Sequence, residues 1–372
     1  MSFMCSWTPV FVLARAMAAT QETQDKPLSV FQRRWRKFKT IKRGWYSFQM
    51  LIGLYLLSFC APFLVSDEAV AVSYQGELRV PMFSNHIEAR DLGQRKIGSP
   101  NYRALKEQYA AADAGDWVLM PLYPYGPIEN LLSDPSFEGR PPTGPDGSHW
   151  LGTDDRGRDV LARLVYGFRI SITFALGMVL ISYAIGMTIG AIFGFFGGRV
   201  DIFGQRLVEI WAALPFLYTV IIISSIVQPT VGLLIPLLAI FSWVGISFYM
   251  RGEFLREKAK DYVAAAIAIG EPNRRIMFKH ILPNALTPII SFAPFAIVGG
   301  ISALVSLDFL GFGLPAPTPS WGELVGQGLA HIKDWHLVVF PMGALFATLL
   351  MVVFIGEAIR EAFDPKVFSR LR

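Results

Sequence analysis

Five stretches of this chain carry no charged residue, and their lengths limit the folds that it can adopt. These stretches are Gly44–Ser66, Ile170–Gly198, Ile210–Met250, Ile281–Leu307 and Leu337–Gly356. A helix needs about 20 apolar residues to cross a bilayer. Within lipid the backbone must be helical, because no water is present to satisfy stray polar groups. So many long apolar runs are unsuited to the core of a water-soluble domain, and the sequence predicts an all-α integral membrane protein.

The longest run sets the number of spans. Four of the runs fit one span each, but Ile210–Met250 is too long for one and is interrupted by the sequence Gln228-Pro229-Thr230-Val231-Gly232. We therefore expect six transmembrane helices. The same runs explain why only 17% of the residues are charged, against roughly 25% in an average soluble domain.

The distribution of Lys and Arg predicts the orientation. The segment FQRRWRKFKTIKRG, directly before the first run, contains basic residues and no acid. Lys and Arg are enriched in short cytoplasmic loops, so we place the N-terminus in the cytoplasm, and six spans return the C-terminus there. The basic loops Arg199–Arg206 and Arg251–Lys279 agree. The net charge of +5 then indicates membrane topology and contact with anionic lipids. Nucleic-acid binding is the alternative, and the span that follows argues against it.

The expected organisation follows from these spans. It comprises a basic cytoplasmic segment (1–43), a first transmembrane helix (44–66), a periplasmic insertion (67–150), an interfacial segment (151–168), a five-helix core (169–360) with a cytoplasmic loop (251–284), and a cytoplasmic tail (361–372). Prolines in the insertion argue against long helices except around Tyr102–Ala112, and Val70–Val80 alternates like a strand or two. We expect an irregular cap that packs on other subunits or on the lipid surface.

The N-terminal residues resemble a weak signal peptide. Val10–Ala19 is mildly apolar, but Arg15 interrupts it and no charge precedes it. We interpret it as a soluble or surface-lying extension, with Met17 as an alternative start. Cys5 and Cys60 are the only cysteines, and no structural disulfide is expected.

A polar segment, Leu151–Asp159, follows the insertion and reads LGTDDRGRD. Asp159 is suited to cap a helix over Val160–Tyr166, which we expect to be amphipathic and to lie at the membrane interface. The aspartates of the segment could form a metal site. The arginines between them favour pairing within the segment instead, so no bound metal is predicted.

No sequence pattern for catalysis or nucleotide binding is present. The chain lacks a GxxxxGK[ST] loop, an HExxH pattern and a GxSxG pattern, so we expect no enzyme activity and no directly bound cofactor. Asp308 lies near the outer end of a span, where a buried charge is expensive and often functional. Two accounts remain: hydration at the interface, or a place in the substrate pathway where it holds a cationic group of the cargo.

The segment Asp261–Asn284 lies in the loop 251–284 between two apolar runs, and such a polar loop suggests docking of a cytoplasmic partner. It resembles the EAA loop of the membrane subunits of ABC importers, which contacts the ATPase. We call residues 251–284 the coupling loop. Its candidate contact residues are Asp261, Ala264, Ala265, Ala266, Gly270, Glu271, Arg274, Arg275 and Pro283. Ala264 stands where the family usually has Glu, so we expect nearby charged residues to make that contact: Asp261, Glu271, Arg274 and Arg275. Gly270 suits the turn that must follow a helix.

Three other segments support the resemblance, in the same order as in the family. Leu151–Asp159 resembles the signature LGTDxxGRDxxSR, with Ala162 in place of Ser. Phe309–Gly322 contains the Pro-rich APTPSWG sequence, and Gly356–Pro365 is similar to the ending GDxLRDxLDP. From about Gly44 onward, the chain is identified as a member of the oligopeptide/dipeptide-type ABC importer permeases. The insertion is most similar to that of the Yej-type subset, which is linked to peptide and microcin C uptake.

The resemblance implies a type I ABC importer permease fold and alternating access. It implies import of peptides across a bacterial inner membrane with several partners: a second homologous permease, one fused or two separate ATPase subunits that use ATP and Mg, and a periplasmic peptide-binding protein. Two other classes were weighed. A secondary transporter needs ionisable residues at the centres of its spans, and a membrane-embedded enzyme needs a reactive cluster near the interface. The sequence offers neither.

Overall fold

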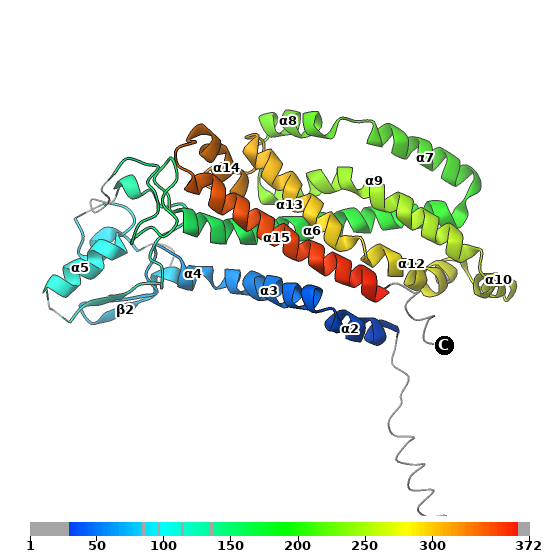
Figure 1. The fold of residues 1–372 in the computed structure, drawn as a ribbon, viewed down its shortest axis with the longest axis horizontal. Helices are drawn as coiled ribbons and strands as arrows, with labels where there is room; N and C mark the ends of the chain where they lie inside the picture. Colours follow the sequence, from blue (N-terminus) through cyan, green and yellow to red (C-terminus); the bar gives the residue numbers. More distant parts are fainter. Residues whose placement is uncertain are drawn as a thin grey trace, which may run out of the picture.

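The computed structural model describes residues 30–363 except 84–86, 96, 113–114, 134–136 and 138. The expected N-terminal extension, the alternative start at Met17 and the tail after Phe363 lie outside these residues. The described chain forms an elongated bundle of helices, with a smaller α/β unit at one end (Figure 1).

Helices dominate the chain outside the insertion. In chain order they are α2 (Val30–Thr40), α3 (Lys42–Phe59), α4 (Ala61–Leu64), α6 (Val160–Phe196), α7 (Gly198–Ala212), α8 (Phe216–Ile226), α9 (Val231–Lys258), α10 (Asp261–Ala268), α11 (Asn273–Arg275), a π-helical turn (Ile276–Ile281), α12 (Leu282–Ile290), α13 (Ala293–Phe309), α14 (Trp321–Ala330) and α15 (His336–Phe363).

Within the described residues, three helices are long and apolar enough to cross a membrane: α6, α9 and α15. The number rises to five if each of two bent pairs forms one span: α7 with α8, and the continuous helical segment Asn273–Ile290, which ends with α12, with α13. The expected first span, α3, does not meet this criterion. Its first turn contains Lys42 and Arg43, and Gln49 follows, which together lower its mean hydropathy. The chain is therefore mainly helical with three to five candidate spans, and the sixth predicted span is not established.

Prolines mark both bends. The α7–α8 pair bends by 63° where Pro215 precedes α8, and the α12–α13 pair bends by 55° where Pro294 lies in the first turn of α13. Proline lacks a backbone N–H and its ring disfavours helix at the residue before it. Both bends therefore lie beside a proline that disfavours a continuous helix. Helix α15 continues through Pro341 without a break.

Helix α6 is longer than predicted. The helix expected over Val160–Tyr166 is present, and these residues form the first turns of a helix that continues unbroken to Phe196. The glycines of α6 face α9. A methyl group built at Gly186, Gly190 or Gly194 would lie 2.3–2.6 Å from a carbonyl oxygen of α9. Small residues allow two helices to approach this closely, so the glycine repeat serves packing between α6 and α9.

The insertion has its own small core. Strands β1 (Ala71–Tyr74), β2 (Glu77–Arg79) and β3 (Trp117–Leu119) form an antiparallel sheet in the order β2-β1-β3, in which Val72 pairs with both Arg79 and Val118. Helix α5 (Tyr102–Ala112) covers the sheet, and three 3₁₀ turns complete the unit: Pro81–Phe83, Ala89–Leu92 and Leu131–Ser133.

The predicted helix near 102–112 and the strands within 70–80 are confirmed. Much of the insertion is irregular, as expected, but it also has a small core that the sequence did not indicate. Strand β3 follows α5 in the chain and pairs with β1, so that Val72, Leu105 and Val118 are buried together in one cluster. An alternating pattern of only three residues, Trp117–Leu119, is too short to have predicted this strand.

Candidate functional site

The segment Leu151–Asp159 forms a compact loop at the N-terminal end of α6, next to the insertion, and we call it the signature loop. Asp159 caps α6, because its Oδ1 accepts a hydrogen bond from the Ala162 N–H at 2.9 Å. Its Oδ2 accepts one from the Tyr123 hydroxyl at 2.6 Å and lies 2.9 Å from Nδ1 of His149. Burial, and then the nearby carboxylate, raise the pKa of Tyr123, which keeps the hydroxyl protonated as a donor. The predicted N-cap is confirmed.

A buried ion network joins the signature loop to two helices. Arg158 donates to Asp154 at 2.6 Å and to Glu323 of α14 at 3.0 Å. Arg163 of α6 also donates to Glu323 and to the carbonyl of Pro127 in the insertion, the latter at 3.1 Å. Asp154, Arg158 and Arg163 are each less than 5% exposed. Buried charges are tolerated when they are paired in this way, so the network fixes the insertion against α6 and α14.

The predicted pairing within the signature loop is therefore confirmed for Asp154 and Arg158. The aspartates do not converge on one point, since Asp154 contacts arginines whereas Asp159 contacts Tyr123 and His149. Among the described residues, no group of three His, Cys, Asp or Glu side chains is placed to hold a metal ion.

The carboxylate of Asp308, at the end of α13, is enclosed by the turn that follows this helix. Its carboxylate accepts hydrogen bonds from the Leu314 N–H at 2.7 Å and from the Ser320 hydroxyl at 2.6 Å. A methyl group built at Gly313 would lie 1.9 Å from Oδ1, so the turn closes directly over the carboxylate. The residue is only 9% exposed. The expected hydration at the interface is wrong, and Asp308 instead holds the Pro-rich turn between α13 and α14.

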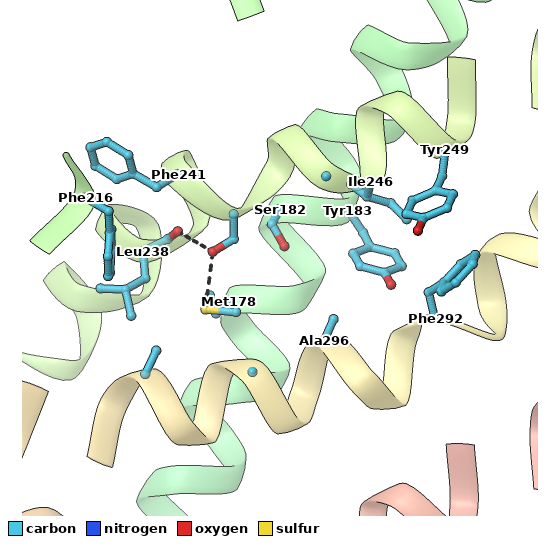
Figure 2. A pocket seen from close by; sticks show the side chains of 14 residues that line it. Met178, Ser182, Tyr183, Phe216, Leu238, Phe241, Ile246, Tyr249, Phe292 and Ala296 are labelled. Atoms are coloured by element: carbon cyan, nitrogen blue, oxygen red, sulfur yellow. Dashed lines mark hydrogen bonds between the residues drawn. The ribbon is translucent and has the colours of Figure 1, made fainter. Parts of the chain in front are cut away.

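A cavity of about 490 Å³ lies between helices α6, α8, α9 and α13 (Figure 2). None of the described residues that line it is charged. Tyr249 stacks on Phe292 with ring centroids 4.4 Å apart, and Tyr183 lies at the same end of the cavity in Figure 2. The remaining lining residues are Met178, Ser182, Phe216, Leu238, Phe241, Ser242, Gly245, Ile246, Ala296, Gly299 and Ala303. Aromatic faces and hydroxyl groups can accommodate a mixed polar and apolar molecule without selecting one charge.

The sequence did not reveal this cavity. Its aromatic residues stand within apolar runs, where a ring that faces a cavity has the same pattern as one that faces lipid. Asp308, the predicted pathway residue, is not among the lining residues. Two of the lining glycines open directly onto the space: a methyl group built at Gly245 or Gly299 meets no atom within 4 Å.

In the coupling loop, Gly270 ends helix α10 in a left-handed conformation with φ +77°. Its N–H donates to the carbonyl of Ile267 at 3.0 Å, and the N–H of Glu271 donates to the carbonyl of Ala266 at 3.1 Å. This pair of bonds is a Schellman motif, in which glycine is preferred because it lacks a Cβ. A Cβ at this position would meet nothing, so the requirement comes from the backbone angle alone. The predicted role of Gly270 is confirmed.

The solvent-exposed face of the coupling loop is apolar and basic. Val263 and Ala266 pack inward, whereas Ile267 is 52% exposed, Ile269 is 76% exposed and Phe278 is 66% exposed. Several predicted contact residues are exposed beside them: Asp261, Ala264, Ala265, Arg274, Arg275 and Pro283. Large exposed apolar residues grouped with cations are typical of a docking surface.

The acids of the coupling loop have unequal roles. Glu271 lies 2.7 Å from Nε2 of His280 and 3.5 Å from Nε of Arg275, and its side chain is 14% exposed. These contacts fold the loop onto itself. Asp261 and Arg274 form no ion pair with any described residue and remain available to a partner. Glu271 is therefore a weaker candidate than Asp261 to replace the acid that the family usually has at Ala264.

A second set of bonds fixes the loop to the helices on either side. Glu257, near the end of α9, is only 3% exposed and accepts hydrogen bonds from Lys260 at 2.7 Å and from the Tyr262 hydroxyl at 2.8 Å. The same hydroxyl accepts a bond from Asn284 of α12 at 3.2 Å. A displacement of α10 must therefore move the ends of both α9 and α12.

Residues 186–369 match the family described as binding-protein-dependent transport system inner membrane component. The chain is 36% identical over 380 residues to the peptidoglycan transport system permease protein YejE of Agrobacterium fabrum, covering 95% of this chain and 99% of that protein. It is 38% identical over 339 residues to the inner membrane ABC transporter permease protein YejE of Escherichia coli, covering 90% and 97%. It is also 38% identical over 223 residues to the oligopeptide transport system permease protein OppC of Haemophilus influenzae, covering 59% and 71%.

Proposed function

Since this chain belongs to the family of inner-membrane components of binding-protein-dependent transport systems, we propose that it moves peptides or peptide-like compounds from the periplasm to the cytoplasm by alternating access. It is a permease subunit of an ATP-driven importer and not itself an enzyme. Its relatives carry names that refer to peptidoglycan, oligopeptides and dipeptides. Peptide bonds are the chemistry that these cargoes share, and microcin C is a further candidate cargo of the Yej-type relatives.

The family implies an ATPase and a periplasmic binding protein as partners. In finer detail, a second homologous permease completes the pathway, and one fused or two separate ATPase subunits use ATP and Mg on the cytoplasmic side. The exposed Ile267, Ile269 and Phe278 of the coupling loop support docking of the ATPase there. This chain has no P-loop sequence, in keeping with ATP hydrolysis by the partner.

The proposed topology has six spans, with α3 as the first, both termini in the cytoplasm and residues 67–150 in the periplasm. The basic residues before α3 and in the coupling loop support this orientation. A reporter that is active only in the periplasm, fused at Gly115 of the insertion, tests it. Activity at Gly115 is expected, and activity of a cytoplasmic reporter at the same site would overturn the topology.

One observation carries the mechanism: the coupling loop connects two segments that line the cavity. Helix α9 contributes Phe241 and Tyr249 to the lining and then enters the loop, and after the loop α12 leads to α13, which contributes Ala296 and Gly299. An ATPase that binds one loop position more tightly than another thereby favours one arrangement of these helices. Because the cavity has no charge, its shape and hydroxyl groups decide which cargo passes.

The test fills the cavity without disturbing the packing. Gly245→Leu and Gly299→Leu place a side chain in open space, and both should strongly reduce peptide uptake by the assembled importer while membrane insertion persists. Gly343→Leu is the matched control, since Gly343 lies on the exposed side of α15 and a methyl group there also meets nothing. Normal uptake by both cavity variants would place the pathway elsewhere.

A further inference from the structure

Helix α2 and the first turns of α3 carry an aromatic cluster with cations around it. The rings of Trp35, Phe38, Trp45 and Phe48 contact one another with centroids 5.5–6.0 Å apart. The ammonium of Lys39 lies 5.7 Å from the Trp35 ring and 5.2 Å from the Trp45 ring. Cations over ring faces are attracted by the ring quadrupole, so the cluster holds Lys39 in a defined place.

Three cations of this region have no acidic partner in the described part of the chain, whereas Arg43 pairs with Glu357 of α15 at 3.4 Å. No acid occurs between Phe31 and Ser66. Arg36, Lys39 and Lys42 are exposed, and none of them forms an ion pair with an acid in the described part of the chain. We call these three cations, with the aromatic cluster, the basic belt.

The position of the basic belt matches the edge of a membrane. Helix α3 continues from α2 after the single residue Ile41, and both lie beside the C-terminal half of α15 (Figure 1). Trp35 is 37% exposed and Tyr46 is 63% exposed. Tryptophan and tyrosine concentrate where a span meets the headgroup region. With the orientation proposed above, on which this inference rests, that region belongs to the cytoplasmic leaflet.

Helix α2, which carries part of the basic belt, is also in contact with the helix that follows the coupling loop. Arg34 of α2 donates to the Thr287 hydroxyl of α12 at 3.0 Å, and its guanidinium lies 4.8 Å from the ring centroid of Phe363 at the end of α15. Lys37 donates to the carbonyl of Glu361 at 3.0 Å. Any ligand that fixes α2 therefore acts on α12 and α15 together.

We propose that the basic belt binds anionic phospholipid headgroups of the cytoplasmic leaflet, and that this binding holds α2 against α12 and α15. Exposed ammonium and guanidinium groups complement lipid phosphates, and the anionic cytoplasmic leaflet attracts cations next to a span. A lipid fits better than a nucleic acid or an acidic protein, because Trp35 and Trp45 place the cations at the depth where acyl chains begin. The aromatic rings face apolar chains while the cations face phosphates.

The experiment measures lipid retention by the purified, assembled importer. The probes are dioleoylphosphatidylglycerol and dioleoylphosphatidylcholine, added to the complex in neutral detergent and counted by native mass spectrometry. The variant R36Q/K39Q/K42Q keeps every ring and leaves Arg34 and Lys37 in place. The control R90Q/K106Q/R140Q removes the same number of exposed cations from the insertion.

Wild-type complex and control should retain phosphatidylglycerol in preference to phosphatidylcholine. The basic-belt variant should lose roughly fivefold in affinity for each cation removed, and higher salt should weaken binding in the wild type. Equal retention of phosphatidylglycerol by variant and wild type would overturn the proposal. Loss of ATPase binding with unchanged lipid retention would also overturn it, and would assign the surface to an acidic protein.

A second readout separates this proposal from the assignment of the cargo. In liposomes of phosphatidylethanolamine with either phosphatidylglycerol or phosphatidylcholine, uptake by the wild type should depend on phosphatidylglycerol, and uptake by the variant should lose that dependence. If no peptide is transported at all, the proposed function fails, yet the retention measurement still decides whether the basic belt binds lipid.

Discussion

The two ends of the helix bundle differ in which side chains they bury and which they expose. The end next to the insertion buries the charged residues Asp154, Arg158 and Arg163, and the two arginines pair with Glu323 of α14. At the other end, helix α10 and the turn after it leave apolar side chains exposed, with Ile267 at 52% and Ile269 at 76%. The signature loop therefore buries charged side chains, whereas the coupling loop exposes apolar ones.

This difference shows which region is complete without a partner. Buried ions are stable only with their partners in place, and the ions of the signature loop pair with residues of this same chain. Exposed apolar groups are left where another surface is to cover them. The conspicuous charges of the signature loop are therefore structural, whereas the modest apolar residues of the coupling loop mark the site of interaction.

The largest expected effect concerns the ion network of the signature loop. Arg163→Met should destabilise the junction by about 3 kcal/mol, because the buried Asp154 and the partly buried Glu323 lose one of the cations that they contact. Arg158 still pairs with both acids and limits the loss. Thermal unfolding of the purified complex measures this loss. Arg206→Met is the control, since Arg206 and Glu209 form an exposed pair on α7 that contributes little. Similar losses in both variants would mean that the network has no special structural role.

The next effect tests the coupling loop. Gly270→Pro should abolish uptake while membrane insertion persists, because proline cannot adopt φ +77° or donate the bond to Ile267 and costs about 3 kcal/mol in such a place. Gly270→Asn should retain most uptake, since asparagine tolerates the left-handed region and the space is open. Radiolabelled peptide uptake in whole cells distinguishes the two. Normal transport by the proline variant would refute coupling through this turn.

A third effect concerns the insertion and its dependence on pH. Burial, and then the charge of Glu129, raise the pKa of Asp67 to about 6. The folded state therefore binds a proton more tightly than the unfolded state, and the stability gained by protonation is lost as the pH rises from about 4 to 6. Asp67→Asn should stabilise the insertion by about 2 kcal/mol at neutral pH and remove this dependence.

Hydrogen exchange of the insertion, compared at about pH 4.5 and about pH 7.5, measures this pH dependence because the two values lie below and above the pKa of Asp67. The wild type should be better protected at the lower pH and the asparagine variant equally protected at both. Glu107→Gln is a control, since Glu107 is exposed on α5. A wild type whose protection rises with pH would contradict the account of Asp67.

The smallest expected effect concerns Asp308. Asp308→Asn keeps one acceptor for the Leu314 N–H or the Ser320 hydroxyl and should cost about 1–2 kcal/mol. Cargo preference should not change, because Asp308 does not line the cavity. Competition between a cationic and a neutral peptide in uptake assays tests this. A changed preference at unchanged stability would return Asp308 to the substrate pathway.

Features controlled by neighbouring residues could be predicted from the sequence. The cap at Asp159, the turn at Gly270 and the bend at Pro215 each follow from the backbone preferences of one residue and its neighbours. The apolar runs likewise predicted a helical membrane protein, because a span depends on composition along a continuous stretch.

Features that depend on residues far apart in the sequence could not be predicted. Glu323 meets Arg158 across more than 160 positions, and nothing near either residue indicates the other. The burial of Asp308 depends on how the turn at Gly313 closes over it. The cavity depends on which side of α9 faces α13, and the uniformly apolar sequence of these helices gives no sign of a preferred face.

The contact between the coupling loop and the ATPase is the central claim, and crosslinking tests it most directly. In a background without Cys5 and Cys60, a cysteine at Ile267 is labelled with a photoactivated crosslinker in the assembled importer. Ile226→Cys at the end of α8 serves as the control, since Ile226 is more exposed than Ile267. We predict an adduct between Ile267→Cys and the ATPase whose yield changes when ATP is added, and none from Ile226→Cys. Absence of any adduct from Ile267→Cys in a complex that still imports peptide would contradict the account.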